Sequence, residues 1–72
     1  MINEKYKNLN ISIEIMFNSG IICEKRLIIS DDAYILLNKR QLFASTCDIH
    51  IAAKKHIDYL YTDPTFTPKV KG

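Results

Sequence analysis

The stretch LNISIEIMFNSGIICEKRLII, residues 9–29, decides the fold of this 72-residue chain. Apolar and polar residues alternate from Leu9 to Phe17, and a period of two predicts a strand with one buried face. Asn18-Ser19-Gly20 predicts a three-residue turn, in which Gly20 takes the left-handed conformation that its missing Cβ permits. A second strand then runs from Ile21 to Ile29, and together the two strands form a β-hairpin over residues 8–29.

The expected turn sets the register of this hairpin. It places Ile13 opposite Lys25 and Ile11 opposite Leu27. Lys25 then lies in an apolar row, where its stem can pack while its ammonium group reaches water. A two-residue turn would set Ile13 opposite Arg26 and would keep fewer apolar rows intact, so the three-residue turn is preferred.

Ser30-Asp31-Asp32 has the chemistry of a helix start. Ser30 can accept a first-turn N–H, and both aspartates lie at the positive end of the helix dipole. We therefore expect an α-helix over residues 31–43, with its apolar face formed by Ala33, Leu36, Leu37, Phe43 and Ala44. Ile35 and Leu42 fall on the opposite side of that helix and indicate a second contact surface, for a dimer or a target.

A second helix is expected over residues 47–61, capped by Ser45 or Thr46. Its apolar stripe recurs at i, i+3, i+4, i+7, i+8 and i+11, which is the period of an amphipathic helix, and consists of Ile49, Ala52, Ala53, His56, Ile57 and Leu60. The alternative is a second hairpin in this segment, giving a ββαββ order, because residues 47–51 also alternate. Lys54-Lys55 is poor turn chemistry, which favours the helix.

These elements predict an α+β fold, in which an N-terminal antiparallel β-hairpin is followed by two α-helices packed on one face. Residues 1–62 form a single small domain, and residues 63–72, with two prolines, form an extended tail. Because a two-stranded sheet is marginally stable alone, we expect a homodimer that covers the sheet edge or the surplus apolar surface.

Composition excludes several classes of function. Hydrophobic residues make up 47% of the chain, and ten basic against eight acidic residues give a net charge of +2. The basic residues are interspersed, whereas a nucleic-acid groove clusters them. The sequence shows no signal peptide and no apolar run near the ~18 residues that span a bilayer. We therefore expect a cytoplasmic protein without membrane contact, in which Cys23 and Cys47 are reduced thiols.

The segment CDIHIAAKKH, residues 47–56, carries the residues that could form a reactive or metal-binding site. Cys47 and His50 are one helical turn apart, but His56 lies about 240° around the helix from His50 and cannot join them. A structural zinc site needs four ligands, and thiol catalysis needs an orienting group and an oxyanion hole. We expect no metal, no cofactor and no catalytic residue, and hence no enzyme.

The remaining hypothesis is a small non-catalytic regulator or inhibitor, of the kind that phages and mobile elements encode, which binds a partner protein. Its expected contact residues are Tyr34, Ile35, Leu42, Tyr59 and Tyr61, because tyrosines and exposed aliphatics are typical of interfaces. One alternative is a nucleic-acid-binding regulator that uses Lys39, Arg40, Lys54 and Lys55. A second alternative is a small RNase-type toxin that uses His50 and His56.

Overall fold

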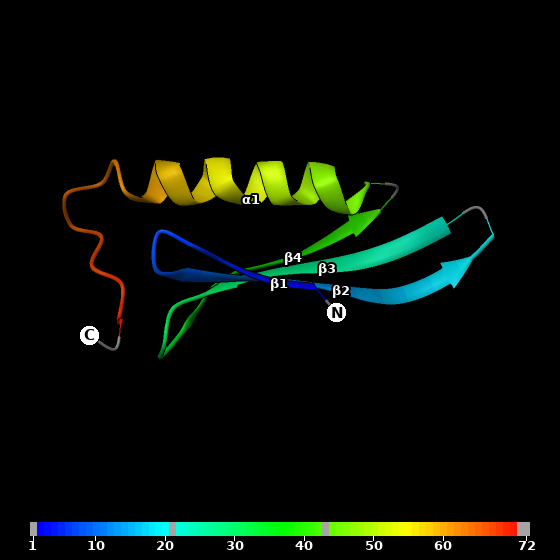
Figure 1. The fold of residues 1–72 in the computed structure, drawn as a ribbon, viewed down its shortest axis with the longest axis horizontal. Helices are drawn as coiled ribbons and strands as arrows, with labels where there is room; N and C mark the ends of the chain where they lie inside the picture. The colour runs from blue at the N-terminus through cyan, green and yellow to red at the C-terminus, as the bar shows by residue number, and fades with distance from the viewer. Residues whose placement is uncertain (1, 21, 43, 71–72) are drawn as a thin grey trace.

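The chain forms a four-stranded antiparallel sheet followed by one helix (Figure 1). The computed structural model describes residues 2–20, 22–42 and 44–70. The strands lie in the order in which the chain makes them. They are β1 (Ile2–Tyr6), β2 (Leu9–Ser19), β3 (Ile22–Ser30) and β4 (Ile35–Leu42), and the helix is α1 (Thr46–Leu60). The expected arrangement of one hairpin and two helices is therefore wrong.

The hairpin over residues 8–29 is confirmed as β2 and β3, but its register differs from the expected one. Ile13 pairs with Leu27, and Ile11 pairs with Ile29. A register shift between Ile15 and Phe17 adds a residue to β2, which is the signature of a β-bulge. This register opposes aliphatic residues within the buried row, whereas the expected one put Lys25 opposite Ile13. Gly20 has a φ of 60°, the left-handed conformation that its sequence position predicts. Asn18 and Ser19 are paired with β3, however, so the expected three-residue turn over residues 18–20 is wrong.

Strand β1 was not expected from the sequence. It joins β2 through Lys7 and Asn8, whose φ values are 48° and 69°. Two successive residues with positive φ form the kind of tight turn that matches the right-handed twist of paired strands. β1 escapes recognition because its helix-facing side carries Glu4 between Ile2 and Tyr6, and none of these three residues is buried, so the strand shows no apolar row.

The segment expected as a helix over residues 31–43 contains β4 instead. Asp31 Oδ1 accepts the backbone N–H groups of Ala33 at 2.8 Å and Tyr34 at 2.7 Å, and so closes the turn between β3 and β4. A helix cap uses the same chemistry, a side-chain oxygen that accepts N–H groups two and three residues ahead. The expected cap was Ser30, but Ser30 ends β3 and pairs with Ile35, so the predicted helix start is wrong and the acceptor chemistry of Asp31 serves the β3–β4 turn.

The helix expected over residues 47–61 is confirmed, and the alternative second hairpin there is wrong. Ser45 is the N-cap, and its side chain accepts the N–H of Asp48. Ile49, Ala53 and Ile57 are buried against the β2 and β3 side chains, which are Leu9, Ile11, Ile13, Leu27 and Ile29. The helix therefore covers one face of the sheet and leaves the other face open, while the β2–β3 hairpin extends beyond the start of α1 (Figure 1).

Two contacts outside the aliphatic core tie the remaining segments to it. Lys25 is buried, and its ammonium donates to the carbonyl of Ala44 at 2.9 Å rather than reaching water as expected. After the helix, the chain returns to the β3–β4 turn. There Lys69 accepts the N–H of Asp32 at 2.8 Å and donates its own N–H to Asp31 at 3.0 Å. Phe66 packs against the core on the way.

The core contacts of α1 predict the effect of truncating its buried face. Ile57→Ala should lower the free energy of unfolding by about 2–5 kcal/mol, because it removes a fully buried side chain and leaves a cavity. Ile51→Ala is the matched control in the same helix, since Ile51 is half exposed, and it should change stability by less than about 0.5 kcal/mol. Urea unfolding followed by circular dichroism measures both, and equal effects would contradict this packing.

Candidate functional site

The outer edge of β4 is the longer of the two unpaired edges in the described sheet, since β1 at the other end has five residues and β4 has eight. β4 hydrogen-bonds with β3 on one side only, and in residues 2–20, 22–42 and 44–70 no backbone hydrogen bond to its other edge is found. Proteins usually shorten, charge or cover such an edge. β4 is eight residues long, and Tyr34 and Ile35 at its start are 64% and 62% exposed, with Leu42 at its end 47% exposed.

Alternate residues of β4 face the two sides of the sheet. Lys39 pairs with buried Leu27, and Leu37 pairs with buried Ile29, so both lie on the side that α1 covers. Arg40 lies on the open side, where its Nε is 2.7 Å from Glu24 Oε1. The open side also carries a hydrogen bond from Arg26 Nη1 to Asn38 Oδ1 at 2.9 Å.

On the β1 side of the helix, Glu4 joins sheet to helix. Its Oε1 is 2.9 Å from Lys54 Nζ, and its Oε2 is 2.8 Å from His50 Nδ1. The Nδ1 atom is buried and, beyond this close approach, has no hydrogen-bond partner among the described residues. The hydrogen bond from Lys54 lowers the pKa of the Glu4 carboxyl below its ordinary value of 4.5. Glu4 is therefore held as a carboxylate between two helix side chains.

Asp58 makes a second link on the same side, nearer the end of the helix. Lys7 Nζ is 2.6 Å from Asp58 Oδ1, and the Tyr6 hydroxyl donates to the same oxygen at 3.1 Å. The hydrogen bond from Lys7 lowers the pKa of Asp58 and raises that of Lys7 itself. Tyr61 completes the link by donating its hydroxyl to the Lys7 carbonyl at 2.7 Å. The β1 side of α1 is thus closed by ion pairs.

On the β4 side of the helix there is a cavity of about 300 Å³ instead. Its polar lining residues are Lys39 and Gln41 from β4 and His56 from α1, and its apolar ones are Leu27, Leu37 and Ala52. No acidic side chain is among these lining residues, and Lys39 and His56 form no ion pair within the described parts of the chain. The cavity lies between α1 and β4, the edge strand of the sheet.

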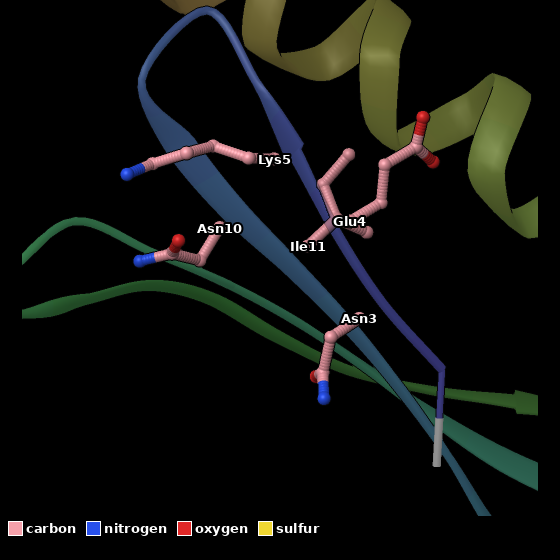
Figure 2. A pocket seen from close by; sticks show the side chains of 5 residues that line it. All are labelled: Asn3, Glu4, Lys5, Asn10 and Ile11. Carbon is pink, nitrogen blue, oxygen red and sulfur yellow. The ribbon is translucent and has the colours of Figure 1, made fainter.

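A second hollow, of about 330 Å³, lies on β1 and β2. Figure 2 shows Asn3, Lys5 and Asn10 extending away from the helix, whereas Glu4 and Ile11 point toward it. Polar and charged side chains on the uncovered face are ordinary for an antiparallel sheet with one face in water. This hollow therefore gives weaker grounds for a site than the edge of β4.

The expected partner-binding residues do not form one patch. Ile35 and Leu42 are the first and last residues of β4, and Tyr34 lies just before it in the β3–β4 turn. Tyr59 is exposed near the end of α1. Tyr61 follows the helix, where its ring meets Phe66 edge-on with centroids 5.2 Å apart. The contacts of Tyr61 hold the end of the helix in place, so Tyr61 has a structural role.

The expected nucleic-acid-binding residues do not line one groove. Lys39 and Arg40 are successive residues of a strand and therefore face opposite sides of the sheet. Arg40 is paired with Glu24, and Lys54 is paired with Glu4. Lys55 lies exposed on the helix. This arrangement leaves Lys39 as the member of the set that faces a cavity.

The candidate reactive residues of α1 are also separated. His50 faces Glu4 on the β1 side, while His56 lines the cavity on the β4 side. Cys47 is exposed as a free thiol at the helix start, and the side chain of Cys23 lies outside the described part of the chain. Among described residues, no three His, Cys, Asp or Glu side chains are grouped so that they could hold a metal ion.

Sequence reasoning missed the residues that position the helix, which are Glu4, Tyr6, Lys7 and Asp58. Their partners are about 46 to 54 positions away in the chain, so no local spacing pairs them. The one available signal was the spacing of His50, Lys54 and Asp58, which puts three ionisable groups on one side of a helix. It indicates a polar contact on that side without naming the partner.

Comparison with protein-family models, with curated proteins and with solved structures gives no match to this chain. Within the described residues, α1 is neither long nor apolar enough to cross a membrane.

The Glu4 contacts predict how stability depends on pH. Because the pKa of folded Glu4 is below 4.5, this carboxylate stabilises the fold above that pH, and the contribution is lost as the pH falls through the folded pKa. Glu4→Gln should therefore flatten the loss of stability below pH 4.5. Lys54→Met should flatten it as well, since it removes the largest cause of the shift. Urea unfolding from pH 3 to 7 measures this, and unchanged slopes in both variants would refute it.

Proposed function

We propose that this protein is a small non-catalytic binding protein, a regulator or inhibitor, which engages a partner protein by pairing a strand with the edge of β4. The observation that carries the proposal is that edge, eight residues long and unpaired on its outer side in the described structure. Ile35 and Leu42 are exposed at its two ends, and Tyr34 is exposed just before it. They belong to the set that the sequence suggested for partner contact.

Strand addition suits what β4 offers. Backbone N–H and C=O groups supply binding free energy that does not depend on side chains, while alternate side chains supply specificity. At about 3.3 Å per residue, eight residues present an edge of roughly 26 Å. An extended segment of that length satisfies an edge that proteins otherwise protect.

Three ionisable residues of α1 make contacts that support a structural role over a catalytic one. His50, Lys54 and Asp58 contact Glu4 and Lys7 at distances of 2.6–2.9 Å, and these contacts fix the helix against β1. A general base must instead face a position where substrate can sit. Their geometry is explained by the fold alone.

Proline scanning tests the proposal. Successive N–H groups of a strand point to opposite edges of that strand. Of the two variants Asn38→Pro and Lys39→Pro, one therefore removes a backbone hydrogen bond to β3, and the other removes an N–H that points away from the sheet. Proline is tolerated on the outer side of an edge strand. The outward variant is the one that keeps the wild-type unfolding midpoint. It should capture the partner from a lysate of the native host at least about tenfold less well than the wild type does. Quantitative mass spectrometry measures the captured protein.

Tyr59→Ala is the control for this experiment, because Tyr59 is exposed on the helix, away from the β4 edge. It should retain the same captured protein at the wild-type level. Retention of that protein by the folded proline variant, or its loss with Tyr59→Ala, would place the interface elsewhere.

A further inference from the structure

We propose that the segment which pairs with β4 carries an acidic side chain on its helix-facing side, and that this carboxylate enters the cavity beneath α1 between Lys39 and His56. The inference rests on the proposed function and adds the chemistry of the partner. It assigns the ligand of this cavity as an Asp or Glu side chain of an extended polypeptide segment.

The first support is the composition of the cavity. Its polar lining is Lys39, Gln41 and His56. A lysine ammonium, a glutamine amide and an imidazole N–H are all donors that a carboxylate accepts. Leu27 and Leu37 are the apolar part of the lining from the sheet, and an apolar surround strengthens a charge-assisted hydrogen bond.

The second support is the difference between the two sides of the helix. On the β1 side, the carboxylate of Glu4 lies between a histidine and a lysine, at 2.8 Å from His50 and 2.9 Å from Lys54. On the β4 side, His56 of the helix and Lys39 of the sheet line one cavity, and no acidic side chain of the described chain lies between them. The chain thus supplies a carboxylate on the β1 side of α1, whereas its described residues supply none at the cavity on the β4 side.

The third support is the position of the cavity relative to the edge. Leu37, Lys39 and Gln41 are the β4 residues on the helix side of the sheet. An added strand presents every second residue to that same side. The residue that it places opposite Lys39 is on the same side of the sheet as α1, one strand further from the helix than β4, and the residue two positions away lies opposite Leu37 or Gln41. The fitting segment therefore has an acidic residue with an aliphatic one two positions from it.

Charge also distinguishes this occupant from a second copy of the chain. β4 carries Lys39 and Arg40 and no acidic residue. If two β4 strands pair antiparallel about Lys39, the two Lys39 side chains lie opposite each other. If they pair about Asn38, the two Lys39 side chains are two positions apart. Like charges that close together destabilise a strand pair, whereas an acidic segment is attracted to it.

A blocked synthetic peptide tests the inference directly. The probe is an eight-residue acetylated and amidated peptide that alternates Thr with Glu and Val, with a matched peptide in which every Glu is Gln. Titration into ¹⁵N-labelled full-length protein, followed by heteronuclear NMR, should shift the β4 amides and the His56 ring signals. The Glu peptide should bind at least about tenfold more tightly than the Gln peptide at low salt, and the ratio should shrink in 0.5 M NaCl.

Two variants locate the carboxylate. Lys39→Gln should weaken binding of the Glu peptide about tenfold and leave the Gln peptide unaffected. Lys55→Gln makes the same change of charge at an exposed helix position, and it should leave both affinities within about twofold.

The outcomes separate this inference from the proposed function. If both peptides shift β4 with equal affinity, strand addition stands and the acidic inference is overturned. If Lys39→Gln has no larger effect than Lys55→Gln, the carboxylate does not enter the cavity. Shifts confined to β1, no shift at millimolar peptide, or a β4-mediated dimer in sedimentation that excludes the peptide, overturn both.

Discussion

One row of aliphatic side chains beneath a single helix holds this structure together. Ile11, Ile13, Leu27 and Ile29 form that row on β2 and β3, and Ile49, Ala53 and Ile57 cover it from α1. Because this row runs along the two central strands, the helix lies over the middle of the sheet and leaves β1 and β4 at its margins. The position of the candidate site follows from this placement, since a helix of ordinary width cannot cover both edges of four strands.

The two margins are completed differently. β1 reaches the helix through charges, with Glu4 between His50 and Lys54, and with Asp58 between Lys7 and Tyr6. Among the described residues β4 has no such ion-pair link to α1, and a cavity lined by Lys39, Gln41 and His56 lies between β4 and the helix. The outer edge of β1 is unpaired as well, but the longer edge of β4 and the unmatched hydrogen-bond donors of the cavity belong to the same margin, and one acidic strand would satisfy both.

The sequence revealed the parts of this fold that are locally encoded. Alternation from Leu9 to Phe17 identified the central hairpin, Gly20 identified its turn, and the stripe through Ile49, Ala53 and Ile57 identified the helix. β4 was missed because Asp31 accepts N–H groups in a turn just as it would at a helix start, and only pairing with β3 tells the two apart. Ile35 and Leu42 were expected to be exposed contact residues, and they are exposed, but on a strand. The cavity between Lys39 and His56 depends on that strand, and it therefore could not be predicted from the sequence.

The account depends most on β4 being a strand with one free edge, and amide hydrogen exchange read by NMR tests this residue by residue. N–H groups bonded to β3 exchange slowly, while those on the outer edge exchange with water. In the isolated protein, the amides from Leu36 to Gln41 should alternate between strong and weak protection. Uniform protection would mean that the edge is already covered, and protection rising and falling as in a helix would mean that β4 is not a strand. Either result would contradict the account.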